Sequence, residues 1–110
     1  ELFNKDSLFN NLIHLKTISE IIKYLIISNK FKLGLIPKVI NISSNKPLRL
    51  EEVIGSMKIQ LNSKSIIKYR VKLVQSKIID TSLAESLEIP LLSTKESLGL
   101  FLDSIKNELF

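Results

Sequence analysis

The chain lacks cysteine and tryptophan, and its 110 residues include one histidine, three glycines and three prolines. The absence of cysteine excludes disulfides, thiol catalysis and thiolate-bound zinc. Aromatic residues make up only 6% of the chain, so stacking platforms for single-stranded nucleic acid are not expected. The apolar runs are short and interrupted by lysine, serine or asparagine, so none is long enough to span a membrane.

Patterns typical of catalytic, cofactor and metal sites are also missing. His14 is the single histidine, so we expect a surface or interface residue rather than a metal ligand or a member of a histidine dyad. Glu51 and Glu52 diverge by about 100° on a helix, and the helix dipole explains them better than a catalytic pair. Gly34 and Gly55 belong to no phosphate-binding motif. We therefore expect no catalytic residue, no metal, no cofactor and no enzymatic activity.

The whole chain has a net charge of +5. Its positive charge is concentrated in one part of the sequence. The stretch from Met57 to Lys77 contains no aspartate or glutamate, whereas residues 78–94 contain three acidic residues and no lysine or arginine. Such a concentration is the pattern expected of a surface that meets phosphate. The six basic residues of the stretch are Lys58, Lys64, Lys68, Arg70, Lys72 and Lys77.

The first half of the chain predicts helices. Asp6 can cap a helix, and Thr17 to Glu20 has the spacing of a capping box that starts a second one. The apolar face over 18–26 is large enough to suggest burial against more than its own domain. Pro37 fits the first turn of a further helix through about residue 43.

The second half predicts a helix over 50–57, a turn at 58–61, and a basic helix over 63–76 that Asn62 or Ser63 caps. Alternation on both sides of a short polar break predicts a β-hairpin over 79–91, with Pro90 restricting its second strand to a sheet edge. A short helix starting at Ser82 is the alternative there.

A last helix follows residue 93 and runs to about residue 109. Together these elements predict one domain, mostly α with a small β-hairpin. Its N-terminal part, 6–34, would be a helical dimerisation extension, and 35–110 the core.

The helix predicted over 63–76 separates by angle into an apolar arc and a basic arc. Stacked lysines repel one another, and a polyanion removes that repulsion with release of counterions. Arg70 falls within the apolar arc. Either the helix rolls so that Arg70 reaches out, or its stem snorkels and it pairs with an acid such as Glu51 or Glu52, which is the structural role that we favour. The basic arc and its neighbours comprise Lys64, Ser65, Lys68, Tyr69, Lys72, Gln75 and Ser76.

Three runs, Leu50 to Met57, Leu61 to Ile67 and Leu73 to Ile79, resemble winged helix-turn-helix DNA-binding regulators of the MarR, PadR and ArsR-like group from bacteria and archaea. Leu91 to Lys95 is similar to the end of their wing. The resemblance implies a winged helix with extra N-terminal helices, and a homodimer formed by helices over 6–31 and 94–109. It implies DNA contacts from Ser63, Lys64, Ser65, Lys68, Tyr69 and Lys72, beside which Gln75 shares the basic arc.

The chain departs from that family at two points. Lys77 stands where a glycine usually follows the recognition helix, and the wing region is acidic where family wings often carry a basic tip. An acidic wing is repelled by DNA, which favours an alternative function as a winged-helix adaptor between proteins in a transcription, replication or partition complex.

The function expected from the sequence is binding of double-stranded DNA by a homodimer, as a cytoplasmic, nucleoid-associated transcription regulator or DNA-organising protein. A basic helix lying on a membrane surface is a weaker rival, because the apolar arc of 63–76 is needed for the core.

Overall fold

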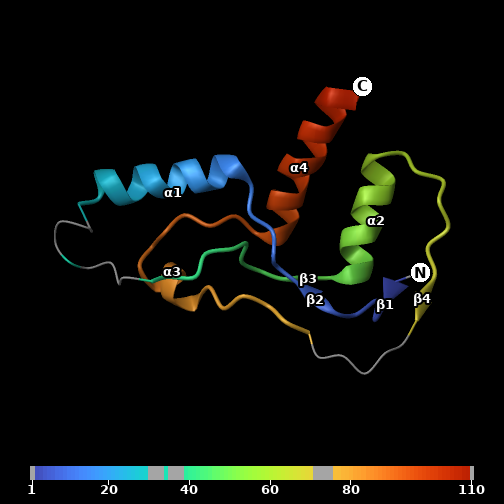
Figure 1. Ribbon diagram of the computed structural model, residues 1–110, viewed down its shortest axis with the longest axis horizontal. Helices are drawn as coiled ribbons and strands as arrows, with labels where there is room; N and C mark the ends of the chain where they lie inside the picture. Colours follow the sequence, from blue (N-terminus) through green and yellow to red (C-terminus); the bar gives the residue numbers. More distant parts are fainter. Residues whose placement is uncertain (1, 30–33, 35–38, 71–75, 110) are drawn as a thin grey trace.

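The computed structural model describes residues 2–29, 34, 39–70 and 76–109. Helices are its main regular structure, accompanied by two short strand pairings (Figure 1). The molecule measures 52 × 39 × 15 Å, and its radius of gyration is 16.6 Å, against about 13 Å for a compact domain of 100 residues. The shortest of the three extents is less than half of either of the others. Ten large apolar side chains of the described residues are exposed, Leu15, Ile22 and Ile26 among them.

Three of the helices expected from periodicity are confirmed: the one with its apolar face over 18–26 by α1 (Leu15–Ile27), the one over 50–57 by α2 (Leu50–Gln60), and the last by α4 (Thr94–Leu109). Ser93 and Glu96 form a capping box at the start of α4, in which each backbone N–H donates to the other side chain at 3.1 Å. The hydrogen bonds from Ser93 lower the pKa of the Glu96 carboxyl. The helices of the described residues are α1 (Leu15–Ile27), α2 (Leu50–Gln60), α3 (Ser82–Ser86) and α4 (Thr94–Leu109).

The strands connect the N-terminus to later parts of the chain. One pairing is parallel, with Leu2 opposite Tyr69, and the other is antiparallel, with Leu8 opposite Arg49. Neither pairing is between neighbours in sequence. The strands are β1 (Leu2–Phe3) with β4 (Tyr69–Arg70), and β2 (Leu8–Phe9) with β3 (Leu48–Arg49).

The hydrophobic core is divided into two clusters, one between α1 and α3 and the other between α2 and α4. The buried residues of the first are Ile21, Leu25, Ala84 and Ile89. Those of the second are Val53, Leu98 and Leu102. Each cluster thus contains only three or four buried residues, with partly buried hydrophobic side chains packed around them.

A buried polar group, which we name the Asn10 hub, joins distant segments of the chain. The Asn10 side chain, 1% exposed, donates to the carbonyls of Ser44 (3.0 Å) and Ile79 (2.8 Å), and its Oδ1 accepts the Ile79 N–H at 2.8 Å. The Ser43 hydroxyl donates to the Asn10 carbonyl, and the hydroxyls of Ser44 and Ser97 are 2.6 Å apart. The hub thus satisfies backbone groups that would otherwise be buried without partners.

The helix expected to begin at Asp6 is wrong, because the first helix begins at Leu15. His14 is its N-cap, and the His14 Nδ1 accepts the backbone N–H of Lys16 at 3.1 Å. Thr17 lies inside the first turn and is buried, so the capping box predicted there is wrong as well. The predicted helical extension over 6–34 is therefore reduced to α1 and preceded by short strands.

The helix predicted from Pro37 is partly testable. Pro37 lies outside the described residues, and residues 39–43 form no helix. The chain passes there into the loop that enters the Asn10 hub through Ser43 and Ser44.

The basic helix predicted over 63–76 is wrong in its described part, because residues 63–68 are not helical and β4 follows them. Asn62 explains the error: it ends α2 with φ of 51° instead of capping a new helix. Its N–H donates to the Ile59 carbonyl (3.1 Å), and the Ser63 N–H donates to the Lys58 carbonyl (2.9 Å). These two bonds form a Schellman motif, in which asparagine tolerates the left-handed conformation.

The β-hairpin predicted over 79–91 is also wrong, and the alternative of a short helix is confirmed by α3. The Asp80 Oδ1 accepts the Ser82 N–H at 2.9 Å, which satisfies a free donor at the helix start and lowers the pKa of Asp80. The part of the predicted fold that is confirmed is a mostly helical chain with a small antiparallel strand pair.

A pair of alanine substitutions tests this fold against the one expected from periodicity. Ile66 is 84% exposed here, whereas the basic helix would bury it in a core. We expect Ile66→Ala to change the free energy of unfolding by less than about 0.5 kcal/mol. Leu102→Ala, at a position 1% exposed, should cost about 2–5 kcal/mol. Urea denaturation measures both, and a cost above about 2 kcal/mol for Ile66→Ala would contradict the structure.

Removal of the Asn10 side chain tests the hub. Asn10→Ala leaves the buried Ser44 carbonyl and the partly buried carbonyl and N–H of Ile79 without their partner, and a fully buried group in that state costs about 1–3 kcal/mol. We expect a loss of several kcal/mol or failure to fold, measured by circular dichroism on heating. The control is Asn11→Ala, because Asn11 is exposed. Equal melting temperatures for the two variants would show that the hub is not formed.

Candidate functional site

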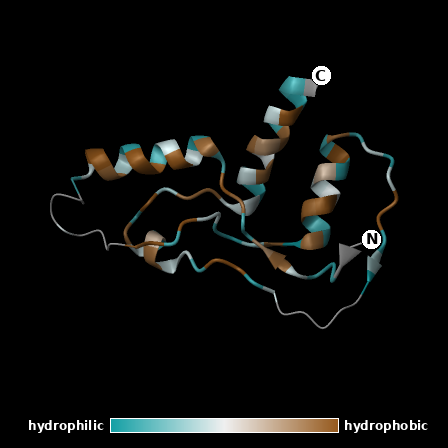
Figure 2. Cartoon of the chain, in the orientation of Figure 1, coloured by the Kyte–Doolittle hydropathy of each residue, from teal (hydrophilic) through white to brown (hydrophobic). Residues whose placement is uncertain are grey.

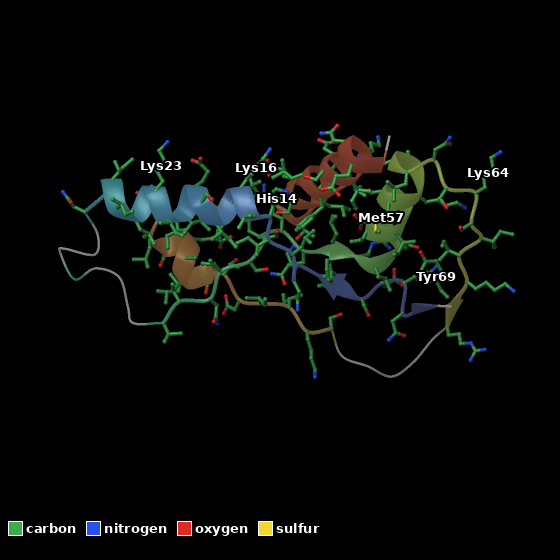
Figure 3. The ribbon with its side chains drawn as sticks, turned by 45° about the horizontal axis from the view of Figure 1, so that its top comes forward. His14, Lys16, Lys23, Met57, Lys64 and Tyr69 are labelled. Carbon is green, nitrogen blue, oxygen red and sulfur yellow. The ribbon has the colours of Figure 1, made fainter. Side chains whose placement is uncertain are left out.

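Residues 61–70, the described part of the acid-free segment that directly follows α2, run along an outer edge of the molecule (Figure 1). Lys64, Lys68 and Arg70 are exposed along it. Figure 3 shows Lys64 at the periphery, directed away from the rest of the chain. The positive charge expected from the sequence is therefore solvent-accessible, although it lies on an extended segment instead of a helix.

Two lysines from other parts of the chain, Lys5 and Lys106, lie beside this segment in the structure. The pairing of β1 with β4 brings the turn that carries Lys5 beside Arg70, and Lys106 of α4 shares a hollow of about 490 Å³ with Gln60, Leu61 and Asn62. We name the resulting surface the basic edge. It comprises Lys5, Lys64, Lys68, Arg70 and Lys106.

The predicted DNA-contact residues are divided by the structure. Lys64, Ser65 and Lys68 are exposed on the basic edge. The Ser63 hydroxyl accepts the Ser65 N–H at 3.2 Å, so Ser63 shapes the loop. Tyr69 is half-buried in β4 (Figure 3). Lys72 and Gln75, also predicted as contacts, lie outside the described residues.

Arg49 forms a cluster of ion pairs with three carboxylates near the start of α2. The Arg49 guanidinium bonds the carboxylates of Glu51 (2.6 Å), Glu52 (2.8 Å) and Asp6 (2.8 Å), and hydrogen bonds with Glu52 and then Asp6 raise its pKa further. Glu51 and Glu52, the partners expected for Arg70, thus both pair with Arg49. The spacing of Arg49 and Glu52, three apart at a helix start, could have indicated part of this cluster.

A fixed turn lies beside β4. The Asn4 N–H donates to the Arg70 carbonyl (2.7 Å), the Ser7 N–H closes the turn on the Asn4 carbonyl (2.8 Å), and the Lys5 carbonyl accepts the Glu51 N–H (2.8 Å). The turn is thus bonded to both β4 and α2. Between the turn and β4 is a hollow of about 500 Å³, lined by Asn4, Lys5, Asp6, Tyr69 and Arg70.

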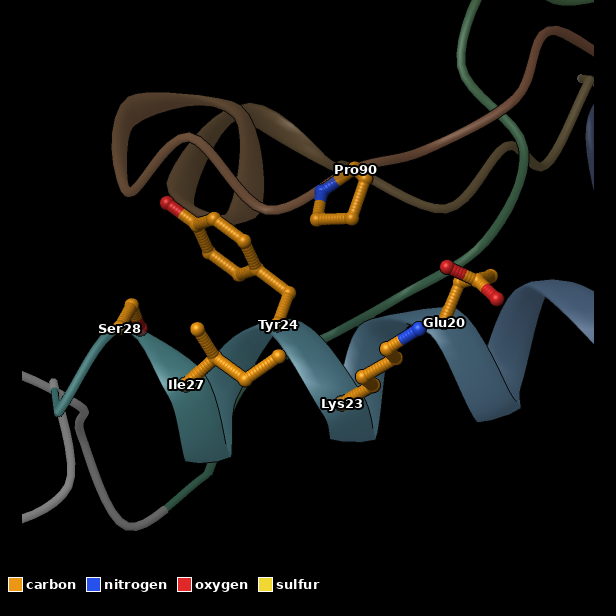
Figure 4. Close-up of a pocket in the computed structure, with 6 residues that line it drawn as sticks. All are labelled: Glu20, Lys23, Tyr24, Ile27, Ser28 and Pro90. Carbon is orange, nitrogen blue, oxygen red and sulfur yellow. The ribbon is translucent and has the colours of Figure 1, made fainter.

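A second surface lies on α1, which presents hydrophobic residues along its length (Figure 2). Leu15, Ile22 and Ile26 are 72%, 54% and 67% exposed, and their spacing places them on one helix face. We name these three residues the α1 stripe. The opposite flank of α1 borders a hollow of about 300 Å³, where Tyr24 rises toward the segment that carries Pro90 (Figure 4).

His14 has a structural environment. Besides capping α1, its Nε2 lies 3.4 Å from the Ser104 hydroxyl, and its ring meets Phe101 edge-on at 4.9 Å between centroids. Histidine thus joins α1 to α4. In the described residues, no group of three or more histidine, cysteine or acidic side chains is placed to hold a metal ion.

Comparison with protein-family models, with curated proteins and with solved structures gave no match. The likeness to winged-helix regulators therefore depends on sequence pattern alone. Among the described residues, no helix has the length and apolarity needed to cross a bilayer.

Proposed function

We propose that this chain binds double-stranded DNA through the basic edge. The observation that carries the proposal is the convergence of Lys5 and Lys106 on an exposed segment that already contains basic residues and no acidic ones. Cationic side chains from three parts of the chain lie on this surface and repel one another. A polyanion that binds there relieves the repulsion.

The mode of binding that this geometry supports is contact with the phosphate backbone. A recognition helix reads base edges in the major groove, whereas residues 63–68 are extended and offer lysine and serine side chains to phosphates. Phosphate contacts position a protein on DNA but carry no sequence information. We therefore favour general DNA binding, as in a DNA-organising protein, over sequence-specific regulation.

The homodimer expected from the sequence remains a proposal, and we place its interface on the α1 stripe. In an antiparallel pair of α1 helices, Leu15 lies opposite Ile26 of the second copy and Ser19 lies opposite Ile22. A self-complementary arrangement of this kind is what a twofold interface requires. The α4 helix, proposed with α1 as the interface, has its buried face turned to α2 instead.

The second candidate function, a protein-protein adaptor, is favoured by the same exposed stripe. Three large apolar side chains on one helix face are typical of a docking surface. If the α1 stripe is a dimer interface, the isolated chain is a dimer. If it is a docking surface for another protein, the isolated chain is a monomer.

Charge reversal on the basic edge tests DNA binding. We expect Lys64→Glu with Lys68→Glu to weaken binding to a 20-base-pair duplex by at least about tenfold at 50 mM salt, because two phosphate contacts become repulsions. The slope of log affinity against log salt should fall by about 0.9 for each lost contact. Fluorescence anisotropy over 50–200 mM salt measures both quantities.

The matched control is Lys46→Glu with Lys95→Glu, which changes the net charge equally, from +5 to +1, at two exposed positions away from the basic edge. The control should lose much less affinity and keep most of the salt slope. Equal losses in the two double variants would mean that only net charge matters and that the basic edge is not the binding surface.

Substitution on the α1 stripe tests the dimer. We expect the wild-type chain to be a dimer at about 50 μM by size-exclusion chromatography with light scattering. Ile22→Glu with Ile26→Glu should give a monomer, because charges would be buried at the interface. The control Lys23→Glu lies beside the stripe. A monomeric wild-type chain would contradict the dimer and leave the stripe to a different protein, as the adaptor function requires.

A further inference from the structure

The hollow between the turn at residues 4–7 and β4 combines three kinds of side chain. Tyr69 contributes a half-buried aromatic ring, Lys5 and Arg70 contribute exposed cations, and Asn4 and Asp6 contribute an amide and a carboxylate. A ring for stacking, polar groups for a base edge and cations for phosphate are the elements that recognise a nucleotide.

Hydrogen bonds hold this hollow in place. The turn is bonded to β4 through the Asn4 N–H and to α2 through the Lys5 carbonyl. Asp6 lines the hollow but bonds Arg49 at 2.8 Å, and this pairing reduces its repulsion of a phosphate. The volume of about 500 Å³ lies within the range of about 300–1,000 Å³ found for small-ligand sites.

We propose that the hollow holds one unpaired nucleotide of a DNA strand, with its base on the Tyr69 ring and its phosphate paired with Lys5 and Arg70. This inference rests on the proposed function and specifies the DNA that is preferred. A base inside a duplex is covered on both faces by its neighbours, so only an unpaired base, at an end, a gap or a flap, reaches the ring.

The site could not be expected from composition, because 6% aromatic content argues against stacking platforms. One ring suffices when tertiary structure supplies the cations. Lys5 is separated from Arg70 by most of the chain, and the parallel pairing of β1 with β4 brings them together.

Substitution of Tyr69 tests the site. We expect wild-type protein to bind a 15-nucleotide oligo(dT), and Tyr69→Leu to weaken that binding about tenfold. Binding to a blunt 15-base-pair duplex should change less than twofold. The matched control Tyr69→Phe keeps the ring and should bind oligo(dT) within twofold of wild type. Unchanged oligo(dT) binding by Tyr69→Leu, or equal losses on both DNAs, would overturn the proposal.

Tyrosine fluorescence gives a second measurement that does not depend on the folding of Tyr69→Leu. The chain has two tyrosines and no tryptophan, so Tyr24→Phe leaves Tyr69 as the single tyrosine emitter. Oligo(dT) should quench this emission as it binds, and the blunt duplex should not. Binding of oligo(dT) without quenching would contradict stacking on Tyr69.

The outcomes separate this inference from the function on which it rests. If binding of the blunt duplex depends on Lys64 and Lys68 but the affinity for oligo(dT) is unchanged by Tyr69→Leu, the nucleotide site is wrong and binding through the basic edge is still supported. If neither DNA binds, the proposed function itself fails. Complete displacement of oligo(dT) by an equal concentration of the mononucleotide dTMP would assign the hollow to a free nucleotide and overturn the proposal.

Discussion

The Asn10 hub is the constraint on which the arrangement of the other elements depends. The described residues form two small apolar clusters instead of a single core, so contacts other than apolar packing must join the two parts. Hydrogen bonds from the buried Asn10 side chain fix Ser44 and Ile79 beside the N-terminal segment, and Ser44 in turn contacts Ser97 of α4. Residues 61–70, which follow the end of α2, lie along an outer edge of the molecule and present Lys64 and Lys68 to solvent (Figure 1).

The parts of the fold that could be predicted from the sequence are those set by local interactions. The α2 and α4 helices follow from apolar spacing and from residues near their ends, such as Ser93 with Glu96. The concentration of positive charge after Met57 was likewise visible without any structure. These features depend on neighbours within a few residues, where a sequence pattern carries most of the information.

The remaining features could not be predicted, because they depend on ambiguous residues or distant partners. Asn62 suits both a helix start and a left-handed helix stop, and the structure uses it as a stop. The alternating residues before and after Ser82 suit a hairpin, but the bond from the Ser82 N–H to Asp80 favours a helix. The hollow beside Tyr69 requires a strand pairing across most of the chain, which no local period encodes.

The proposed DNA surface requires that residues 63–68 form no helix and that Lys64 and Lys68 are exposed, and the arrangement of the chain around it requires the Asn10 hub. Amide hydrogen exchange followed by NMR tests this account most directly. The amides of Ser44 and Ile79, whose bonds to Leu12 and Asn10 lie in the hub, should exchange slowly, and those of residues 64–68 should exchange fast. Fast exchange at Ile79, or slow exchange running continuously through 64–68 as in a helix, would contradict it.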